Sequence, residues 1–409
     1  MSRFRETLRR LGPGIVAGAA DDDPSGIATF SIAGAMYGNA LLWFAWVSWP
    51  FMHAVQMMCA RVGMATGRGL IGALEWKLPK PILVLASLAL FAANTINIGA
   101  DLVGMGEAAE LATGLDAWLF VLLFGGFIGF ATVRLQYRQI ANILKWLALC
   151  LFAYVASAVR LGPDWARVLR DTFTFAVPDW SIVVGLIGCT FSPYFFIWQA
   201  AQEVEEKRDV RGPGAPLAGV RDEDLRYRRI DVAVGTFFSR IVLFFVILTT
   251  SLTLHVRGVG IESANDAAEA LRPIAGPAAT WLYALGLLGV GFLVIPVLSA
   301  SAAYAFAEVF GWRHGLDQKL NRARGFYAVI IVSTVAGIAF RFTSFSPMQA
   351  LFWSGVINGL IAPLLLIAVL LAAGDPAIMK DRVSPRGERI TVAIAIAGML
   401  AATAVWLVM

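Results

Sequence analysis

The sequence predicts an all-α integral membrane protein built from two inverted repeats, and three observations lead to that prediction. The chain of 409 residues is 58% hydrophobic and only 15% charged, far from the composition of an ordinary soluble domain. Apolar stretches of about 20 residues, the length that crosses a bilayer, recur along the chain. Charged residues and helix breakers interrupt two of these stretches at corresponding places in the two halves, which is typical of transporters with inverted repeats.

About eleven stretches are long and uniformly apolar enough to be membrane-spanning helices, whereas barrel strands would be shorter and would alternate in polarity. The predicted spans are residues 14–38, 40–60, 81–110, 117–133, 139–160, 181–201, 230–255, 278–308, 326–342, 347–372 and 390–408. We expect a single transmembrane transporter domain over residues 1–409. Its first repeat would cover about 12–160, its second repeat about 181–372, and a peripheral last helix about 390–408.

The distribution of Lys and Arg predicts the orientation of these spans. Most of the 33 Lys and Arg residues lie in the N-terminal segment and in the alternate loops that would share its side of the membrane. Positively charged loops remain in the cytoplasm, so we expect a multi-pass protein of the plasma membrane with its N-terminus inside and its C-terminus outside. The net charge of +5 then reflects topology, and no nucleic-acid partner is expected.

Several classes of function find no support in the sequence. The chain has no G-x-x-x-x-G-K-[ST] loop, so ATP-driven pumping is not expected. No catalytic constellation appears, so we do not expect an enzyme. The three cysteines, Cys59, Cys150 and Cys189, follow no metal-binding or disulfide spacing. We expect no cofactor and no obligatory protein partner beyond the lipid bilayer.

The first break is the segment 21–26, with sequence DDDPSG, inside the first predicted span. Carboxylates at that depth need a proton, a cation or a water-filled cavity to compensate their charge. Pro24 lacks a backbone donor and Gly26 permits unusual backbone angles, so the helix should open here and expose carbonyl oxygens. Carboxylate and carbonyl oxygens are the ligands of hard divalent cations. For Asp21 and Asp22, simple solvation in an aqueous vestibule is the alternative.

The second break is the segment 188–193, with sequence GCTFSP, inside the predicted span 181–201. Pro193 removes a backbone donor and would free carbonyl oxygens near Cys189, while Ser192 could add a hydroxyl. Proline is tolerated in membrane spans and commonly does no more than kink them, so this break is the weaker signal. If both breaks open, they should meet near the bilayer midplane, where rocking of one bundle against the other would expose them to each side alternately.

The first break resembles the corresponding segment of the Nramp family of divalent-metal transporters. Asp23 and Pro24 match the family's D-P-G-N motif, Pro193 matches its M-P-H motif, and Asp101 fits its proton-carrying aspartate. The resemblance implies a LeuT-type fold in which helices 1 and 6 of the two five-helix repeats are interrupted in mid-membrane. The candidate metal-site residues are Asp23, Ala20, Cys189, Ser192, Gly26 and Asp22, the candidate proton-handling or supporting residues are Asp101 and Tyr194, and the helix breaks are Pro24 and Pro193.

Departures from the family motifs bear on the transported ion. Ser192 replaces the motif's Met, a soft thioether ligand, and Gly26 replaces its Asn. An oxygen-rich, roomier site suits a hard ion that keeps some of its water, so we expect magnesium or manganese, and the Nramp-related magnesium transporters also lack this Met. The Cys189 thiol would favour softer ions if it became a ligand, although the resemblance implies that this residue contributes its backbone carbonyl.

The same comparison predicts weak or absent proton coupling. Tyr194 stands where the family has a His and titrates far from physiological pH, and Gly104 replaces the Glu that follows Asp101. Asp101 remains a candidate proton carrier, or a structural carboxylate paired with a neighbour such as Asn97. One alternative function is a proton-coupled manganese or iron importer of the typical Nramp type. Another is a sodium-coupled organic-solute symporter of the same fold, although three aspartates would repel a substrate carboxylate.

Overall fold

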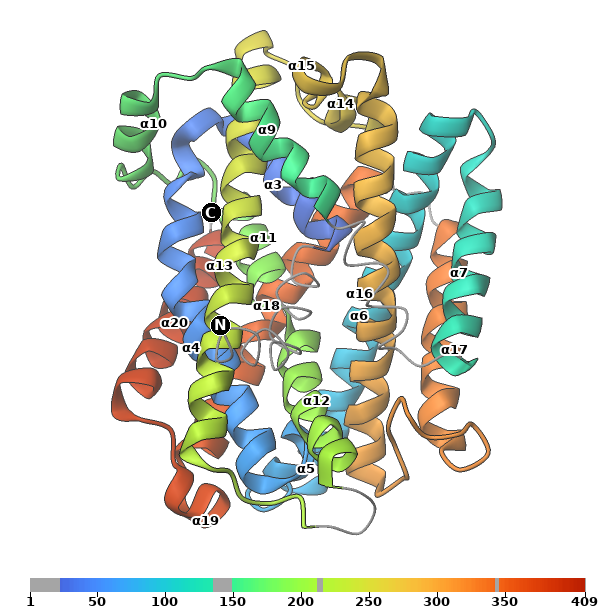
Figure 1. Cartoon of the computed structure of the whole chain (residues 1–409), viewed down its shortest axis with the longest axis vertical. Coiled ribbons are helices and arrows are strands. Elements are labelled where there is room, and N and C mark those ends of the chain that lie inside the picture. The colour runs from blue at the N-terminus through green and yellow to red at the C-terminus, as the bar shows by residue number, and fades with distance from the viewer. Residues whose placement is uncertain (1–22, 135–148, 212–215, 343–345, 409) are drawn as a thin grey trace, which may run out of the picture.

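The computed structural model describes residues 23–134, 149–211, 216–342 and 346–408, which form a bundle of long helices joined by turns and short helices (Figure 1). Over these residues, eight helical segments are long and apolar enough to cross a membrane. A ninth candidate is the pair Pro24–Leu41 and Trp43–Thr66, between which the helix direction bends by 104°. The predicted all-α membrane fold is therefore confirmed.

The long helices follow the predicted spans closely. They are α3 (Pro24–Tyr37), α4 (Trp43–Thr66), α6 (Lys80–Thr113), α7 (Ala117–Arg134), α11 (Trp180–Thr190), α12 (Pro193–Arg211), α13 (Asp222–Thr253), α16 (Ala279–Phe310), α17 (Arg324–Ala339), α18 (Pro347–Gly374) and α20 (Arg386–Val408). Of the predicted span 139–160, only α9 (Phe152–Leu161) and the 3-10 turn before it lie in the described part. The predicted total of eleven spans therefore stays a prediction.

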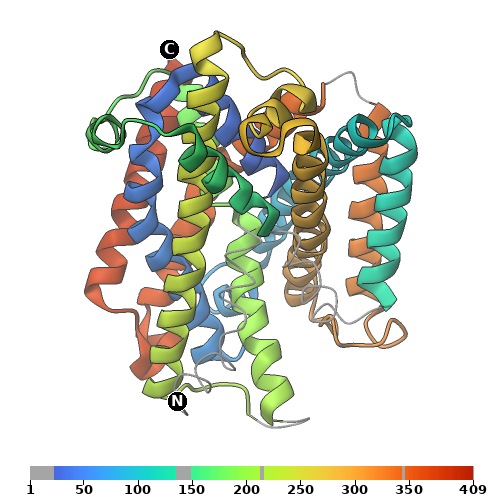
Figure 2. The same cartoon turned by 45° about the horizontal axis from the view of Figure 1, so that its top comes forward.

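Short helices gather at the two ends of the bundle. At one end lie α10 (Trp165–Thr172), α14 (Ala264–Glu269) and α15 (Arg272–Ala275), and at the other lie α5 (Leu70–Leu74) and α19 (Pro376–Met379) (Figure 1). The predicted orientation makes the first end external and the second cytoplasmic. In both views α7 and α17 stand together at one edge of the bundle, where they contact each other (Figure 2).

Both predicted breaks fall at helix boundaries. α11 ends at Thr190 and α12 begins at Pro193, so the second break interrupts one continuous apolar span, Trp180–Asp209. α3 begins at Pro24, whose missing N–H costs nothing in the first turn of a helix. The residues that precede Asp23, including the candidates Ala20 and Asp22, lie outside the described part of the chain.

Close helix packing brings the second break against α18. A Cβ atom on Gly188 would lie 1.8 Å from the carbonyl oxygen of Gly355 and 2.3 Å from the amide nitrogen of Gly359. Only glycine allows two backbones to approach this closely, as small residues do at membrane-helix interfaces. α11 also contacts α3, so the last turn of α11 is held between α3 and α18.

Candidate metal site

Asp23 lies at the centre of the site, fully buried at the N-cap of α3. Its Oδ1 accepts hydrogen bonds from the backbone N–H of Gly26 and from the hydroxyl of Ser25, both at 2.6 Å. Its Oδ2 accepts hydrogen bonds from Asn97 Nδ2 at 3.1 Å and from the Tyr194 hydroxyl at 3.4 Å. Groups from α3, α6 and α12 therefore all bond this carboxylate. The N–H groups in the first turn of a helix have no partner within the helix, so they favour a negative charge at this position.

The second break contributes carbonyl groups, a hydroxyl and a thiol. Ser192 Oγ donates toward the carbonyl oxygens of Gly188 at 2.9 Å and Cys189 at 3.3 Å, so it caps the last turn of α11. The carbonyl that sequence analysis expects to be free is thus shared with Ser192, whose own lone pairs remain available to a cation. A bound cation would have to compete with this cap for the Cys189 carbonyl.

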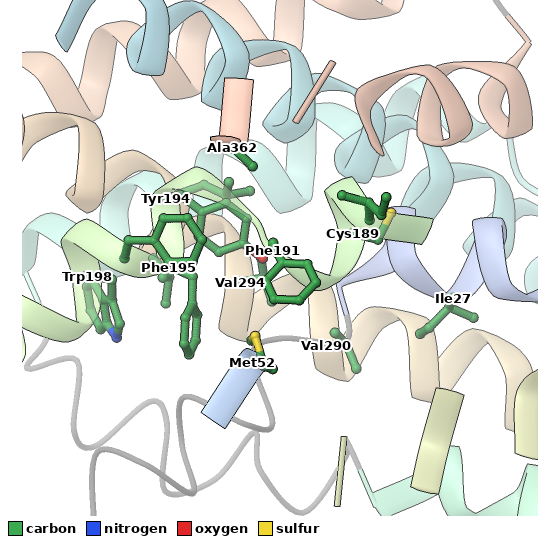
Figure 3. Close-up of a cluster of buried hydrophobic side chains, with 14 of the residues drawn as sticks. Ile27, Met52, Cys189, Phe191, Tyr194, Phe195, Trp198, Val290, Val294 and Ala362 are labelled. Carbon is green, nitrogen blue, oxygen red and sulfur yellow. The ribbon is translucent and has the colours of Figure 1, made fainter. Parts of the chain in front are cut away.

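The thiol of Cys189 faces α3 across the same gap. Its Sγ lies 3.5 Å from Thr29 Oγ1 and 3.8 Å from Ser25 Oγ. Because Ser25 bonds Asp23 directly, one hydroxyl separates the thiol from the central carboxylate. In Figure 3, Phe191 lies between Cys189 and Tyr194 and joins an apolar cluster that lines this part of the break.

A second carboxylate, Asp101, lies beside the first and is also fully buried. The two carboxylates are close enough for their charges to repel each other, and the Ser25 backbone is also nearby. Neither oxygen of Asp101 has a hydrogen-bond partner among the residues that the structure describes. The predicted pairing of Asp101 with Asn97 is wrong, because Asn97 donates to Asp23 instead. Asn94, one turn before Asn97, links α6 to α16 by donating to the Leu298 carbonyl at 2.8 Å.

Position 104, one helical turn after Asp101 on α6, carries no acidic side chain. At position 104 a Cβ would lie 2.8 Å from a methyl carbon of Leu351, so a leucine from α18 fills the space beside Gly104. Any proton on Asp101 therefore has no carboxylate one turn further along this face of α6.

Arg240 lies beside the site, although no role for it was predicted from the sequence. This side chain on α13 is fully buried and donates to Thr190 Oγ1 at 2.8 Å and to Ser48 Oγ at 3.4 Å. It thereby ties the end of α11 to α4 and α13. A single arginine within the predicted span 230–255 was the signal that could have indicated a functional position.

The described site residues supply two carboxylates and several neutral donors. Asp23 and Asp101 come together with the hydroxyls of Ser25 and Tyr194, whereas Gly26 contributes only a backbone N–H to Asp23. Ser192 bonds the carbonyl groups at the end of α11. Within the described residues, no three His, Cys, Asp or Glu side chains are grouped closely enough to hold a metal ion by themselves. A cation here would complete its shell with hydroxyls, carbonyls or water, as hard divalent ions do.

Cavities lie toward both ends of the bundle. The cavity at the predicted external end, of about 510 Å³, is lined by residues that include Tyr37, Asp179 and Glu262. The Tyr37 hydroxyl donates to Asp179 Oδ2 at 2.9 Å and joins α3 to the start of α11. Burial opposes ionisation of Asp179, but hydrogen bonds from Ser181 and Tyr37 outweigh it and hold its pKa below the usual 3.8. The cavity at the predicted cytoplasmic end, of about 320 Å³, is lined by residues that include Glu205 and Glu308.

Nearly the whole chain is similar to known proteins. The family model described as natural resistance-associated macrophage protein-like matches residues 14–409. The divalent metal cation transporter MntH of Caldanaerobacter subterraneus is 26% identical over 400 residues, which cover 95% of this chain and 90% of that protein. MntH of Bacillus subtilis is 23% identical over 394 residues, which cover 94% of this chain and 88% of that protein.

Two solved structures are similar in fold. A structure of the Eremococcus coleocola manganese transporter in complex with an aromatic bis-isothiourea substituted compound has a TM-score of 0.74 at 18% identity, and the match covers 98% of this chain and 86% of that one. MhsT in complex with L-phenylalanine has a TM-score of 0.59 at 14% identity, with 96% and 98% covered. At these identities the likeness shows the fold alone, which is the expected LeuT type.

Proposed function

The chain belongs to the natural resistance-associated macrophage protein (Nramp) family, and we propose that it is a secondary transporter of divalent metal cations, magnesium and/or manganese. We place it in the plasma membrane with a cytoplasmic N-terminus and an external C-terminus. The observation that carries the proposal is the fully buried Asp23 carboxylate at the junction between the start of α3 and the break between α11 and α12, with Asp101 beside it.

The electrostatics of this junction favour a cation as the substrate. Two neighbouring carboxylates away from water cannot both stay charged without a compensating ion or proton. A divalent cation compensates both charges at once and also satisfies the oxygens of Asp101, which have no other partner among the described residues. An organic substrate bearing a carboxylate would instead be repelled, which disfavours the sodium-coupled solute symporter.

The donor set supports a preference for hard ions. Oxygen atoms of Asp23, Asp101 and Ser25 come together at the junction, and position 192 carries a serine hydroxyl where a methionine would supply a thioether. Magnesium and manganese both accept such ligands. Manganese is also favoured because the Eremococcus coleocola protein of the same fold is a manganese transporter. The Cys189 thiol, one hydroxyl from Asp23, would extend the range toward softer ions.

We propose that coupling to protons is weak or absent. Gly104 and Leu351 occupy the place where a second acid would continue a proton route from Asp101. Asn97 and Asn94, on the preceding turns of α6, cannot carry a proton as carboxylates do. One observation favours the typical proton-coupled importer as a second candidate: Asp101 is buried with no hydrogen-bond partner among the described residues, so protonation would stabilise it.

Alternating access would follow from the two repeats, about 12–160 and 181–372. Rocking of one bundle against the other would open the junction first to the external cavity and then to the cytoplasmic one. The glycine contact of Gly188 with Gly355 offers a smooth surface along which α11 and α18 could slide.

The test is transport by purified protein in liposomes that contain either a magnesium-sensitive or a transition-metal-sensitive dye. We expect influx of at least one of these ions, abolished in Asp23→Ala, and little effect of an imposed pH gradient. A matched control is Asp116→Ala, which changes a charge in the turn between α6 and α7. Equal influx in the wild type and Asp23→Ala would refute the proposal.

A further inference from the structure

A groove at the cytoplasmic end of the bundle lies apart from the transport path. It has a volume of about 590 Å³ and runs between the last turns of α18 and the first turns of α20. Its lining includes Lys77, Asp375, Arg386, Arg389, Leu371 and Ile390. Three segments distant in the sequence thus meet here: the turn between α5 and α6, the end of α18 and the start of α20.

The charges in this groove are mainly positive. Lys77 Nζ lies 2.6 Å from Asp375 Oδ2, an ion pair that lowers the pKa of Asp375 and leaves the two side chains neutral together. Arg386 and Arg389 form no ion pair with any described residue, so two positive charges stay uncompensated. Arg389 Nε is buried without a hydrogen-bond partner in the described part, and the rest of its side chain lies against Gly374.

The remaining wall of the groove is apolar and faces outward. Leu371 is 44% exposed and Ile390 is 60% exposed, and Ile394, one turn further along α20, is 55% exposed. On a helix that spans a membrane, such side chains meet acyl chains. The groove therefore combines a cationic end at the membrane surface with an apolar wall that extends toward the hydrocarbon.

This combination matches one kind of ligand. Basic pockets between membrane helices on the cytoplasmic side bind the headgroups of anionic lipids. Arginine suits phosphate because its planar guanidinium donates two parallel hydrogen bonds. A free phosphate would use the arginines but would gain nothing from the apolar wall.

We propose that this groove binds one anionic phospholipid, with its phosphate between Arg386 and Arg389 and an acyl chain along Leu371 and Ile390. The lipid would hold α18, α20 and the Lys77 turn together at the cytoplasmic surface. This proposal does not depend on the transported ion, because no residue of the groove belongs to the metal site.

The test compares lipid binding by the full-length purified protein and its variants in detergent. Phosphatidylglycerol should raise the melting temperature of the wild type, and native mass spectrometry should retain one such lipid per chain. Phosphatidylcholine and inorganic phosphate should do neither. In Arg386→Gln/Arg389→Gln, phosphatidylglycerol affinity should fall about tenfold or more, since each basic side chain near the surface contributes to binding.

Arg322→Gln/Arg324→Gln is the matched control, because it removes two exposed charges outside the groove. It should keep the wild-type affinity. The single exposed variant Arg386→Gln provides a milder change if the double variant is unstable without lipid, and it should lose part of the affinity. Equal losses in the groove and control variants, equal binding of phosphatidylcholine, or an equal effect of inorganic phosphate would overturn the proposal.

Discussion

Replacing Gly188 with alanine should slow transport by separating two helices beside the metal site. The added Cβ would lie 1.8 Å from the Gly355 carbonyl oxygen, whereas real contacts of this kind are at least 3.0 Å, so the backbones must move apart by about 1.2 Å. Overpacking of this kind costs roughly 1–3 kcal/mol of stability. The next residue is Cys189, and a misplacement of about 1 Å in a working site can cost on the order of 100-fold in rate.

The assay is the initial rate of divalent-cation uptake into liposomes, together with thermal unfolding in detergent. Gly188→Ala should transport at least about tenfold more slowly and melt at a lower temperature. Gly126→Ala is the matched control, because its added Cβ meets no atom within 4 Å on α7. Alanine favours a helix over glycine, so this control should be unchanged or slightly more stable. Wild-type uptake and melting in Gly188→Ala would refute this account of the helix crossing.

Three further predictions concern single side chains. Cation uptake should show no steep dependence on pH in either the wild type or Asp101→Asn. A steep dependence in the wild type that vanishes in this variant would contradict weak proton coupling. Arg240→Gln removes the 2.8 Å hydrogen bond to Thr190 and should lower the free energy of unfolding by roughly 1–3 kcal/mol. Its melting temperature should therefore fall further than that of Thr190→Val, and equal melting temperatures of the two variants would show that the arginine does little beyond this bond. Because the pKa of Asp179 lies below 3.8, its stabilising effect should be present above that pH and lost as the pH falls below it, and melting curves of Asp179→Asn should lack this acid-dependent step.

Local features of the fold were predictable because each depends on a few adjacent residues. Pro193 fixes the start of α12 and Pro24 the start of α3, since proline is suited to the first turn of a helix and disrupts its interior. Asp23 was found for a related reason: a carboxylate next to such a break needs compensation wherever the chain folds.

Contacts between helices were not predictable, because they depend on how each helix is rotated and where two helices cross. The pairing of Asn97 with Asp23 rather than Asp101 follows from the rotation of α6 relative to α3. The capping of the Cys189 carbonyl by Ser192 depends on the geometry of the break. Arg240 was visible as a charge in a span, but its link to Thr190 depends on where α13 lies relative to the end of α11.

The most direct test of the central claim is calorimetric titration of the purified protein with manganese and with magnesium, repeated on Asp23→Asn. The account predicts one saturable site in the wild type that binds at least one of these ions, and affinity reduced at least about tenfold in Asp23→Asn, because a charged ligand is replaced by a neutral one. Binding of unchanged affinity and stoichiometry in Asp23→Asn would contradict the claim that the two helix breaks form the cation site around this carboxylate.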